Sequence, residues 1–408
     1  MLVYGAVATV VVWLGAVPWL LVRAVMTGLL PGEWRERLGG APVPALERRP
    51  ILIHAVSAGE MVAARALVDA LVRLDPDVRI ALTTGTSDGR VLADRWRVEV
   101  PQVTWVGFLP WDRPRAMRRW LGHLRPTAVV VVEAELWPGL FRACRDLHLP
   151  LFVVSARLRA RDVTRYRWLG RWWRGLMRLP SRVLAQDAEQ VAAFVSIGVP
   201  PDRVEVGGNL KFDSAPSSAS GRDETVFSIV AGSTHAPEEL WVLEAVARLQ
   251  QSGVACVLTI APRDVRRADS VRRLAAASGV SGFTVLDRMG TLAPAYASAH
   301  VAIAGGTFAP VGGHNIIEPA AVGCVVVLGP HVAHIRSQAA SLCASGGAIV
   351  LDATAAPSTP LFEALQRLQR DRLAREAHGR RAVAWCATHR GGARQAAAIM
   401  LAAMPARR

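Results

Sequence analysis

Continuous apolar runs alternate with helix-like segments along most of the chain. In the first part, such runs lie at 51–56, 79–83, 103–108, 128–133, 151–155 and 182–185, and helices are expected near 61–73, 112–122, 137–147, 161–177 and 187–197. Strands that are apolar throughout are typical of a parallel sheet that helices cover on both faces. This part is therefore predicted to be a Rossmann-like, doubly wound α/β domain.

A second series of the same kind follows a short segment of small and polar residues at 214–221, which is typical of a linker. Strands are expected at 226–231, 255–261, 283–286, 300–304 and 324–328, helices at 237–251, 264–278 and 292–298, and a final helical region over 360–404. We therefore expect a domain at 24–213, a linker at 214–224 and a domain at 225–408, with an interdomain cleft. The final helix is expected to pack back on the first domain.

The start of the chain is predicted to be a membrane anchor over residues 1–23. Residues 1–22 carry no charged side chain, and their length is close to the ~20 residues that a helix needs to cross a bilayer. They lack the basic start and cleavage site of a signal peptide, and the arginines that follow favour a cytoplasmic body. Because Pro18 would kink the helix, a segment lying in the membrane interface is the alternative to a single pass.

The excess of basic over acidic residues indicates which kinds of partner the protein binds. The chain has 48 Lys and Arg against 33 Asp and Glu, a formal net charge of +15, which suits acidic lipid surfaces or phosphorylated substrates. No basic block is interleaved with aromatic residues as in single-strand binders, so no nucleic-acid partner is expected. The five cysteines form no CxxC pair and no zinc-ligand spacing, which indicates buried thiols in a reducing compartment and no metal site.

A glycine-rich stretch at 305–319 follows the apolar run 300–304. Paired glycines at the end of a strand let the backbone approach a ligand closely, and the N–H groups of a following helix favour an anion. Glu318 would accept hydrogen bonds from ribose hydroxyls, whereas His314 is interpreted as structural. A tight turn alone would explain one glycine pair, but two pairs favour a nucleotide pocket. The predicted pocket residues are Gly305, Gly306, Thr307, Gly312, Gly313, Asn315 and Glu318.

Three glutamates are candidates for proton transfer. Glu60 lies between a predicted strand and a helix, where a carboxylate could accept a hydroxyl proton. Ser57 and Glu60 also have the spacing of a capping box, and the helix N-terminus is expected to leave Glu60 ionised and weakly basic. Glu133 and Glu135 end an apolar run, where unpaired carboxylates are rarely buried. One of them is expected to orient Lys211 or a substrate hydroxyl, with a salt bridge to a local arginine as the alternative.

A second group of residues is expected to bind the anionic groups of a donor substrate. A guanidinium fork suits phosphate and carboxylate alike, and hydroxyls with backbone N–H groups at a helix entry suit a phosphate. An ordinary helix entry is the alternative for the second group, because a proline follows it. The predicted donor-binding residues of this kind are Lys211, Ser233, Thr234, His235 and Arg263.

In the order and spacing of eight segments, the chain resembles the Kdo transferases. These are membrane-anchored enzymes that add 3-deoxy-D-manno-octulosonic acid (Kdo) to lipid A precursors. The segments are HAVSAGE at 54–60, FLPWD at 108–112, EAELWP at 133–138, ARL at 156–158, GNLKFD at 208–213, GSTH at 232–235, PR at 262–263 and the stretch at 305–319. The resemblance implies a GT-B architecture, CMP-Kdo as donor, a phosphorylated lipid A precursor as acceptor, inversion at the anomeric carbon, and neither an essential metal nor a cofactor. It favours Glu60 as the catalytic base.

The resemblance also implies that Ser57, Gly59 and Arg157 bind the acceptor, and that a monomer acts at the cytoplasmic face of the inner membrane. The chain departs from the family pattern at Ser155, usually Asn, at Asp264, usually His, and at Ala134, usually Thr. These changes are expected to alter the shape of the sugar site. The alternatives are a GT-B transferase with a UDP-sugar donor and a membrane-anchored protein that binds anionic lipid without chemistry.

Overall fold

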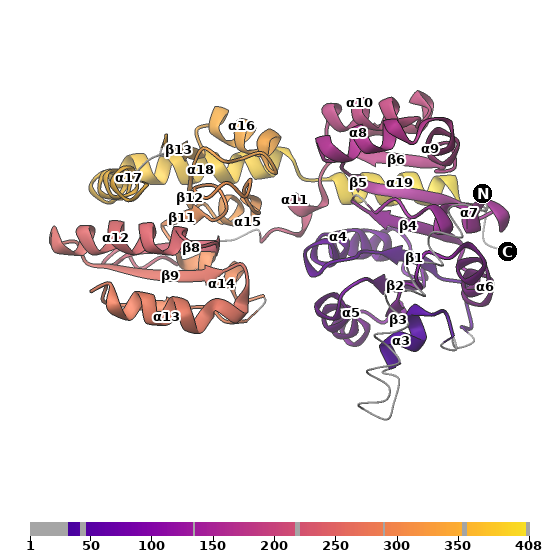
Figure 1. The fold of residues 1–408 in the computed structure, drawn as a ribbon, viewed down its shortest axis with the longest axis horizontal. Helices are drawn as coiled ribbons and strands as arrows, with labels where there is room; N and C mark the ends of the chain where they lie inside the picture. Colours follow the sequence, from indigo (N-terminus) through magenta and orange to yellow (C-terminus); the bar gives the residue numbers. More distant parts are fainter. Residues whose placement is uncertain are drawn as a thin grey trace. The chain divides into compact units, whose positions relative to one another are not determined.

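The computed structural model describes residues 32–40, 46–133, 135–216, 221–288, 290–352 and 357–404 (Figure 1). They form two compact units: unit 1 runs to Ser214 and resumes at Arg390, and unit 2 comprises Ala215–His389. The predicted anchor at 1–23 lies outside the described residues. In the part that the structure describes, no helix has the length and apolar character needed to cross a membrane.

Unit 1 is built on a parallel sheet of seven strands in the described residues. Their spatial order is β3 (Val103–Phe108), β2 (Ile80–Thr84), β1 (Ile51–His54), β4 (Ala128–Val132), β5 (Leu151–Ala156), β6 (Arg182–Ala185) and β7 (Val204–Val206). Alternate residues of a strand serve opposite faces: Ile51 and Ile53 belong to one apolar cluster and Leu52 to the other. The predicted doubly wound domain is confirmed.

The helices of unit 1 cover both faces of this sheet. They are α3 (Gly32–Arg37), α4 (Ala58–Leu74), α5 (Ser87–Glu99), α6 (Pro114–Leu124), α7 (Pro138–Asp146), α8 (Ala160–Trp168), α9 (Gly170–Met177), α10 (Ala188–Ile197), α11 (Leu210–Ser214) and α19 (Gly392–Ala403). The single helix predicted at 161–177 is wrong, because Gly170 adopts a left-handed conformation (φ 59°) and separates α8 from α9. Helix α5 was not predicted, since few of its residues are buried.

The last helix of the chain belongs to unit 1, where Figure 1 shows it in yellow. The Asp213 carboxylate accepts hydrogen bonds from the backbone N–H groups of Gly391 (2.6 Å) and Ala393 (3.0 Å), and so holds the start of α19. Ala397 and Met400 of α19 enter the apolar cluster that α4 also lines. Unit 2 therefore ends at His389 rather than at the end of the chain.

Unit 2 has the same architecture, with a sheet of six parallel strands in its described residues. Their order is β10 (Phe283–Val285), β9 (Cys256–Pro262), β8 (Phe227–Thr234), β11 (Val301–Ala304), β12 (Val325–Leu328) and β13 (Ala348–Val350). The helices are α12 (Glu238–Gln251), α13 (Ala268–Ala277), α14 (Leu292–Ser298), α15 (Ile317–Ala321), α16 (Arg336–Ala344), α17 (Ser358–Arg370) and α18 (Arg372–Thr388). Strand β13 and helix α16 were not predicted, whereas the strands flanking 305–319 are confirmed.

Each sheet has one point at which the strand order reverses. In unit 1 it lies between β1 and β4, and in unit 2 between β8 and β11. Ligands of open α/β sheets bind beyond the carboxyl ends of strands at such switch points. The segments that follow β1 and β4 carry Glu60 and Glu133, and those that follow β8 and β11 carry His235 and Gly305. The predicted site residues therefore lie at the positions where this fold usually binds its ligands.

Candidate functional site

Glu60 lies in the first turn of α4, directly after β1. Ser57 is the N-cap of this helix, and its Oγ accepts a hydrogen bond from the Glu60 N–H (3.3 Å). Glu60 Oε2 in turn accepts from the Val56 N–H (2.7 Å). The Ser57 half of the predicted capping box is thus present, whereas Glu60 accepts from the residue before the N-cap and not from Ser57 itself. Such a contact leaves the second carboxylate oxygen of Glu60 outside the cap.

The environment makes Glu60 more basic than the sequence suggested. Burial and the neighbouring Glu133 carboxylate raise the pKa of Glu60 from 4.5 to about 7, with a smaller contribution from Glu135. The hydrogen bond from Val56 and the charge of Lys211 act in the opposite direction. The prediction of a weakly basic Glu60 is therefore wrong, because burial beside a second carboxylate outweighs the helix N-terminus. A pKa near neutrality suits a general base.

Glu133 follows β4 in a left-handed backbone conformation (φ 61°), which is uncommon for a residue with a side chain. Backbone strain of this kind concentrates at functional sites. Its buried carboxylate pairs with Lys211, whose Nζ lies 2.5 Å from Glu133 Oε1. The salt bridge considered for Glu133 exists, but its partner is a lysine of α11 and not a local arginine. Lys211 accordingly sits with the carboxylates of unit 1.

Glu135 and Arg157 complete the charged part of the site. Burial raises the pKa of Glu135, opposed by Arg159 and assisted by Asp162. Burial lowers the pKa of Arg157, while the negative charge of Glu133 opposes this shift. The four predicted residues Glu60, Glu133, Glu135 and Arg157 line one cavity of about 690 Å³.

Helices α8 and α9 supply a basic and aromatic wall to this cavity, which the sequence analysis missed. Tyr166 stacks on Trp173, with ring centroids 4.0 Å apart and an interplanar angle of 5°. The other lining residues of this wall include Arg159, Arg161, Arg165 and Trp172. The density of arginine and aromatic residues over 157–178 was the available signal. Ser57 and Gly59 adjoin Glu60 but are not among the residues that line the cavity.

Two of the departures from the family pattern have a structural account. Ser155 has φ 51°, a conformation that Asn tolerates better than most residues. Its Oγ accepts hydrogen bonds from Gln186 Nε2 (3.2 Å) and the Leu210 N–H (3.3 Å), so it supports the segment before Lys211. Asp264 is turned to its own loop, where it pairs with Arg266 (2.8 Å). The third, Ala134, lies outside the described residues.

In unit 2, a single buried carboxylate joins the segments that follow β8 and β11. Glu238 accepts four backbone hydrogen bonds, from the N–H groups of His235 (2.9 Å), Gly306 (2.8 Å), Phe308 (3.0 Å) and Ala309 (3.0 Å). Glu238 was not among the predicted site residues, and an ordinary helix entry was only the alternative considered for Ser233, Thr234 and His235. The acidic pair Glu238 and Glu239, which begins three residues after His235, was the available signal. Glu238 fixes the shape of the glycine-rich loop.

The hydroxyl groups of two predicted donor-binding residues are already engaged within the protein. Thr234 is buried and donates to Glu239 Oε1 (2.9 Å). Thr307 is fully buried, donates to the Ala304 carbonyl (2.6 Å) and accepts from the Gly329 N–H (2.9 Å). The Thr234 side chain therefore joins the end of β8 to α12, and the Thr307 side chain joins the ends of β11 and β12.

The backbone geometry of the loop requires glycine at Gly305 and Gly306, whether or not a ligand binds there. A Cβ at Gly305 would lie 2.2 Å from the Ser233 carbonyl oxygen, so no other residue fits between β8 and this loop. Gly306 has φ 72°, and its carbonyl accepts from the N–H groups of Gly312 (2.9 Å) and Gly313 (2.8 Å). The tight-turn interpretation is thus confirmed for these glycines, and it is compatible with a ligand resting on the closed loop.

Two histidines face each other beside this loop. Nε2 of His235 lies 2.7 Å from Nε2 of His314, and the rings stack with centroids 5.0 Å apart. Burial lowers the pKa of His314 to about 4, with the charges of His235 and Arg263 contributing. At neutral pH His314 is therefore uncharged. Nearby, Asn315 Nδ2 donates to Glu318 Oε1 (2.8 Å).

Comparison with known proteins gives a consistent result. A family profile described as 3-Deoxy-D-manno-octulosonic-acid transferase (kdotransferase) matches residues 32–214. A 3-deoxy-D-manno-octulosonic acid transferase of Bordetella pertussis is 34% identical, over 94% of this chain and 94% of that protein. One of Haemophilus influenzae is 27% identical, over 77% of this chain and 78% of that protein. The UDP-GlcNAc 2-epimerase of Neisseria meningitidis shares the fold, with a TM-score of 0.60, 12% identity and coverage of 86% and 98%.

Proposed function

Because the chain belongs to the 3-deoxy-D-manno-octulosonic acid transferase family, we propose that it transfers Kdo from CMP-Kdo to a phosphorylated lipid A precursor, with inversion at the anomeric carbon. Family membership makes it a glycosyltransferase that transfers Kdo in lipopolysaccharide biosynthesis. The donor, the acceptor and the stereochemistry are the proposal. The observation that supports it best is a carboxylate of pKa about 7, Glu60, in a cavity lined by arginine and aromatic side chains.

Glu60 is the proposed base. An acceptor hydroxyl loses its proton to Glu60 while its oxygen forms a bond to the anomeric carbon of Kdo, and the bond from that carbon to the CMP phosphate oxygen breaks. CMP leaves with the electron pair. Lys211 and Glu133 are proposed as positioning residues, since their ion pair lies beside Glu60 and its charges move the Glu60 pKa in opposite directions.

The basic wall of the unit 1 cavity suits the acceptor. Guanidinium groups bind phosphate through paired N–H donors, and Arg157, Arg159, Arg161 and Arg165 all line the cavity. The aromatic pair Tyr166–Trp173 offers an apolar surface beside them. A phosphorylated sugar carrying acyl chains has both kinds of surface. Gly59 and Ser57 are proposed to contact it next to Glu60.

Unit 2 is proposed to bind the nucleotide sugar. Arg263, which is exposed after β9, would face the phosphate or the Kdo carboxylate, together with His235 and the N–H groups of the GSTH segment. Glu318 would accept from ribose hydroxyls. The donor is tested by incubating the protein with CMP-Kdo and analysing the nucleotide: release of CMP supports it. Release of UDP from a UDP-sugar, with CMP-Kdo untouched, would favour the alternative transferase.

We also propose that residues 1–23 hold the enzyme at the inner membrane with its body in the cytoplasm. The uncharged segment followed by arginines supports this topology. A reporter enzyme active only in the cytoplasm, fused to the C-terminus, is expected to be active. Activity of a periplasm-specific reporter at the same position would reverse the assignment.

The rate is expected to depend on the ionisation of Glu60. With a pKa of about 7, kcat/KM should rise roughly tenfold per pH unit below 7 and level off above it, because only the ionised form accepts a proton.

The stability of the protein should also depend on this proton. The folded state binds it more tightly than an unfolded chain, in which the pKa of Glu60 is 4.5. The free energy of unfolding should therefore fall as the pH rises from 4.5 to 7. In Glu60→Gln, the part of this pH dependence that comes from Glu60 should disappear.

Two variants should move the rate profile in opposite directions. Lys211→Met removes a cation that lowers the Glu60 pKa, so the midpoint should move to higher pH. Glu133→Gln removes an anion that raises it, so the midpoint should move to lower pH. The measurement is kcat/KM against pH for both variants and the unchanged protein. Midpoints that stay together would show that Glu60 does not set the profile.

A further inference from the structure

Unit 2 has a hollow at the amino ends of its strands, opposite the end at which the glycine-rich loop lies. Its volume is about 340 Å³, within the range of small-molecule sites. His300, which lines it, directly precedes β11, whereas Gly305 directly follows that strand. Four residues of strand span roughly 13 Å. The hollow is thus separate from the candidate donor site.

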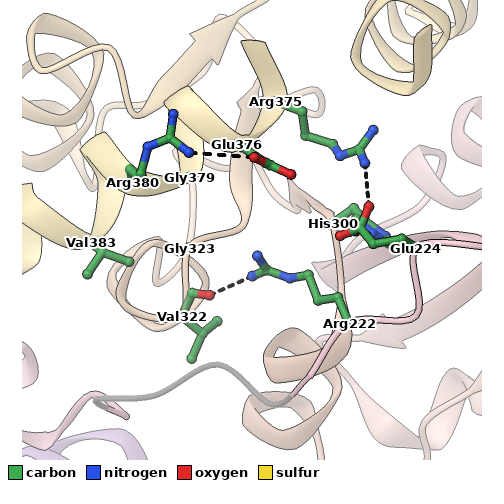
Figure 2. A pocket seen from close by; sticks show the side chains of 10 residues that line it. All are labelled: Arg222, Glu224, His300, Val322, Gly323, Arg375, Glu376, Gly379, Arg380 and Val383. Atoms are coloured by element: carbon green, nitrogen blue, oxygen red, sulfur yellow. Dashed lines mark hydrogen bonds and ion pairs between the residues drawn. The ribbon is translucent and has the colours of Figure 1, made fainter. Parts of the chain in front are cut away.

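Figure 2 shows the charged residues around this hollow and the pairs they form. Glu224 pairs with Arg375 (3.0 Å), and Glu376 pairs more loosely with Arg380 (3.6 Å). Arg222 differs from these arginines, because among the described residues no carboxylate forms an ion pair with it. Three guanidinium groups and two carboxylates leave the lining with a net positive charge.

Arg222 lines the hollow and reaches toward Val322, and its Nη2 donates to the Val322 carbonyl (2.5 Å). Its Nε is buried and has no hydrogen-bond partner within the described residues. A buried donor without an acceptor is unfavourable, and more so when it carries charge. The guanidinium charge of Arg222 is therefore not neutralised by a carboxylate of the described residues, and guanidinium groups bind oxyanions through paired N–H donors.

His300 adds no charge to this lining. Its Nδ1 accepts the Ser228 N–H (3.1 Å), so the proton sits on Nε2, which faces Glu224 Oε1 at 3.5 Å. Burial lowers the pKa of His300, with the charge of Arg375 contributing and Glu224 opposing. The net positive charge of the hollow at neutral pH therefore comes from its arginines alone.

The rest of the wall is apolar and open. Val322 and Val383 line it, and the Val383 side chain is 40% exposed. Gly323 and Gly379 pack backbone to backbone: a Cβ at Gly379 would meet the Gly323 carbonyl oxygen at 2.4 Å. No side chain from either glycine fills the space. The hollow therefore combines a guanidinium that has no carboxylate partner among the described residues with a small apolar surface.

We propose that this hollow binds a small oxyanion, a phosphate or carboxylate carried on a compact molecule, with Arg222 as its main donor. The site is independent of the proposed transfer reaction, because it shares no residue with the candidate donor and acceptor sites. A ligand of this size is expected to bind with a Kd on the order of 1 mM.

The test is isothermal titration of the full-length protein with inorganic phosphate and, separately, with succinate. Saturable binding of at least one anion is expected, weakened at least tenfold by Arg222→Met and by Val383→Trp, which fills the hollow and leaves Arg222 in place. Arg288→Met is the matched control, since its side chain is 86% exposed, and it should bind as the unchanged protein does.

Saturating CMP should leave the binding of phosphate and succinate unchanged. Binding that CMP abolishes and Val383→Trp does not would place the anion elsewhere and overturn the proposal. Absence of saturable binding of both anions by the unchanged protein would also overturn it. Neither result depends on whether the protein transfers Kdo.

Discussion

Glu60→Gln is expected to lower kcat by about 10²- to 10⁴-fold while the protein stays folded. A lost general base typically has an effect of that size. Glutamine keeps the shape of the side chain and an oxygen that can accept the Val56 N–H, but it cannot take a proton. The fold should survive because the contacts of the Ser57 cap remain available. The measurement is kcat together with the melting temperature.

The competing interpretation of Glu60 predicts a different pattern. A residue that only caps α4 would cost about 1 kcal/mol of stability when changed, and kcat would follow only through unfolding. Glu205→Gln, at an exposed position of β7, is the matched control and should change neither quantity. Near-normal kcat with a lowered melting temperature in Glu60→Gln would make Glu60 a cap. Glu133 or Glu135 would then be the next candidates for the base.

Glu238→Ala is expected to lower the free energy of unfolding by at least about 3 kcal/mol. The change leaves four backbone N–H groups without their acceptor, and each buried group without a partner costs ~1–3 kcal/mol. The loops after β8 and β11 should also lose their mutual support, so CMP binding should fall with stability. Denaturant unfolding and CMP titration measure the two effects.

Glu244→Ala is the matched control for that change. It removes an exposed glutamate from the same helix, α12, and should alter stability by less than about 0.5 kcal/mol. A Glu238→Ala protein as stable as the control, with CMP binding retained, would show that the buried carboxylate is not what shapes the loop.

Much of the fold could be predicted because its strands are apolar along their whole length. Strand β11 is an uninterrupted apolar run that ends at a glycine pair, so both its position and its end were predictable. Strand β7 has the sequence Val-Glu-Val with two exposed residues, and α5 is polar with few buried positions. Neither segment carries enough apolar residues to show the period of a strand or a helix, so the local pattern does not reveal them.

The candidate site was predictable in its positions but not in its electrostatics. Glu60 and Glu133 stand directly after strands that the pattern predicted. Their proximity depends on the pairing of β1 with β4, which brings the Glu133 charge close enough to add to the effect of burial on the Glu60 pKa. Lys211 joins them from a distant part of the chain. Glu238 was missed because a helix-entry glutamate is common, and only the fold shows that it is buried against two loops.

The most direct test of the proposed function is mass spectrometry of the lipid product. The purified full-length protein is incubated with CMP-Kdo and a phosphorylated lipid A precursor, beside the Bordetella pertussis relative as a positive control. The proposal predicts a lipid whose mass has increased by one or more Kdo residues, dependent on both substrates and lost in Glu60→Gln. An unchanged lipid mass with this protein, in a reaction where the relative yields the Kdo-lipid, would contradict it.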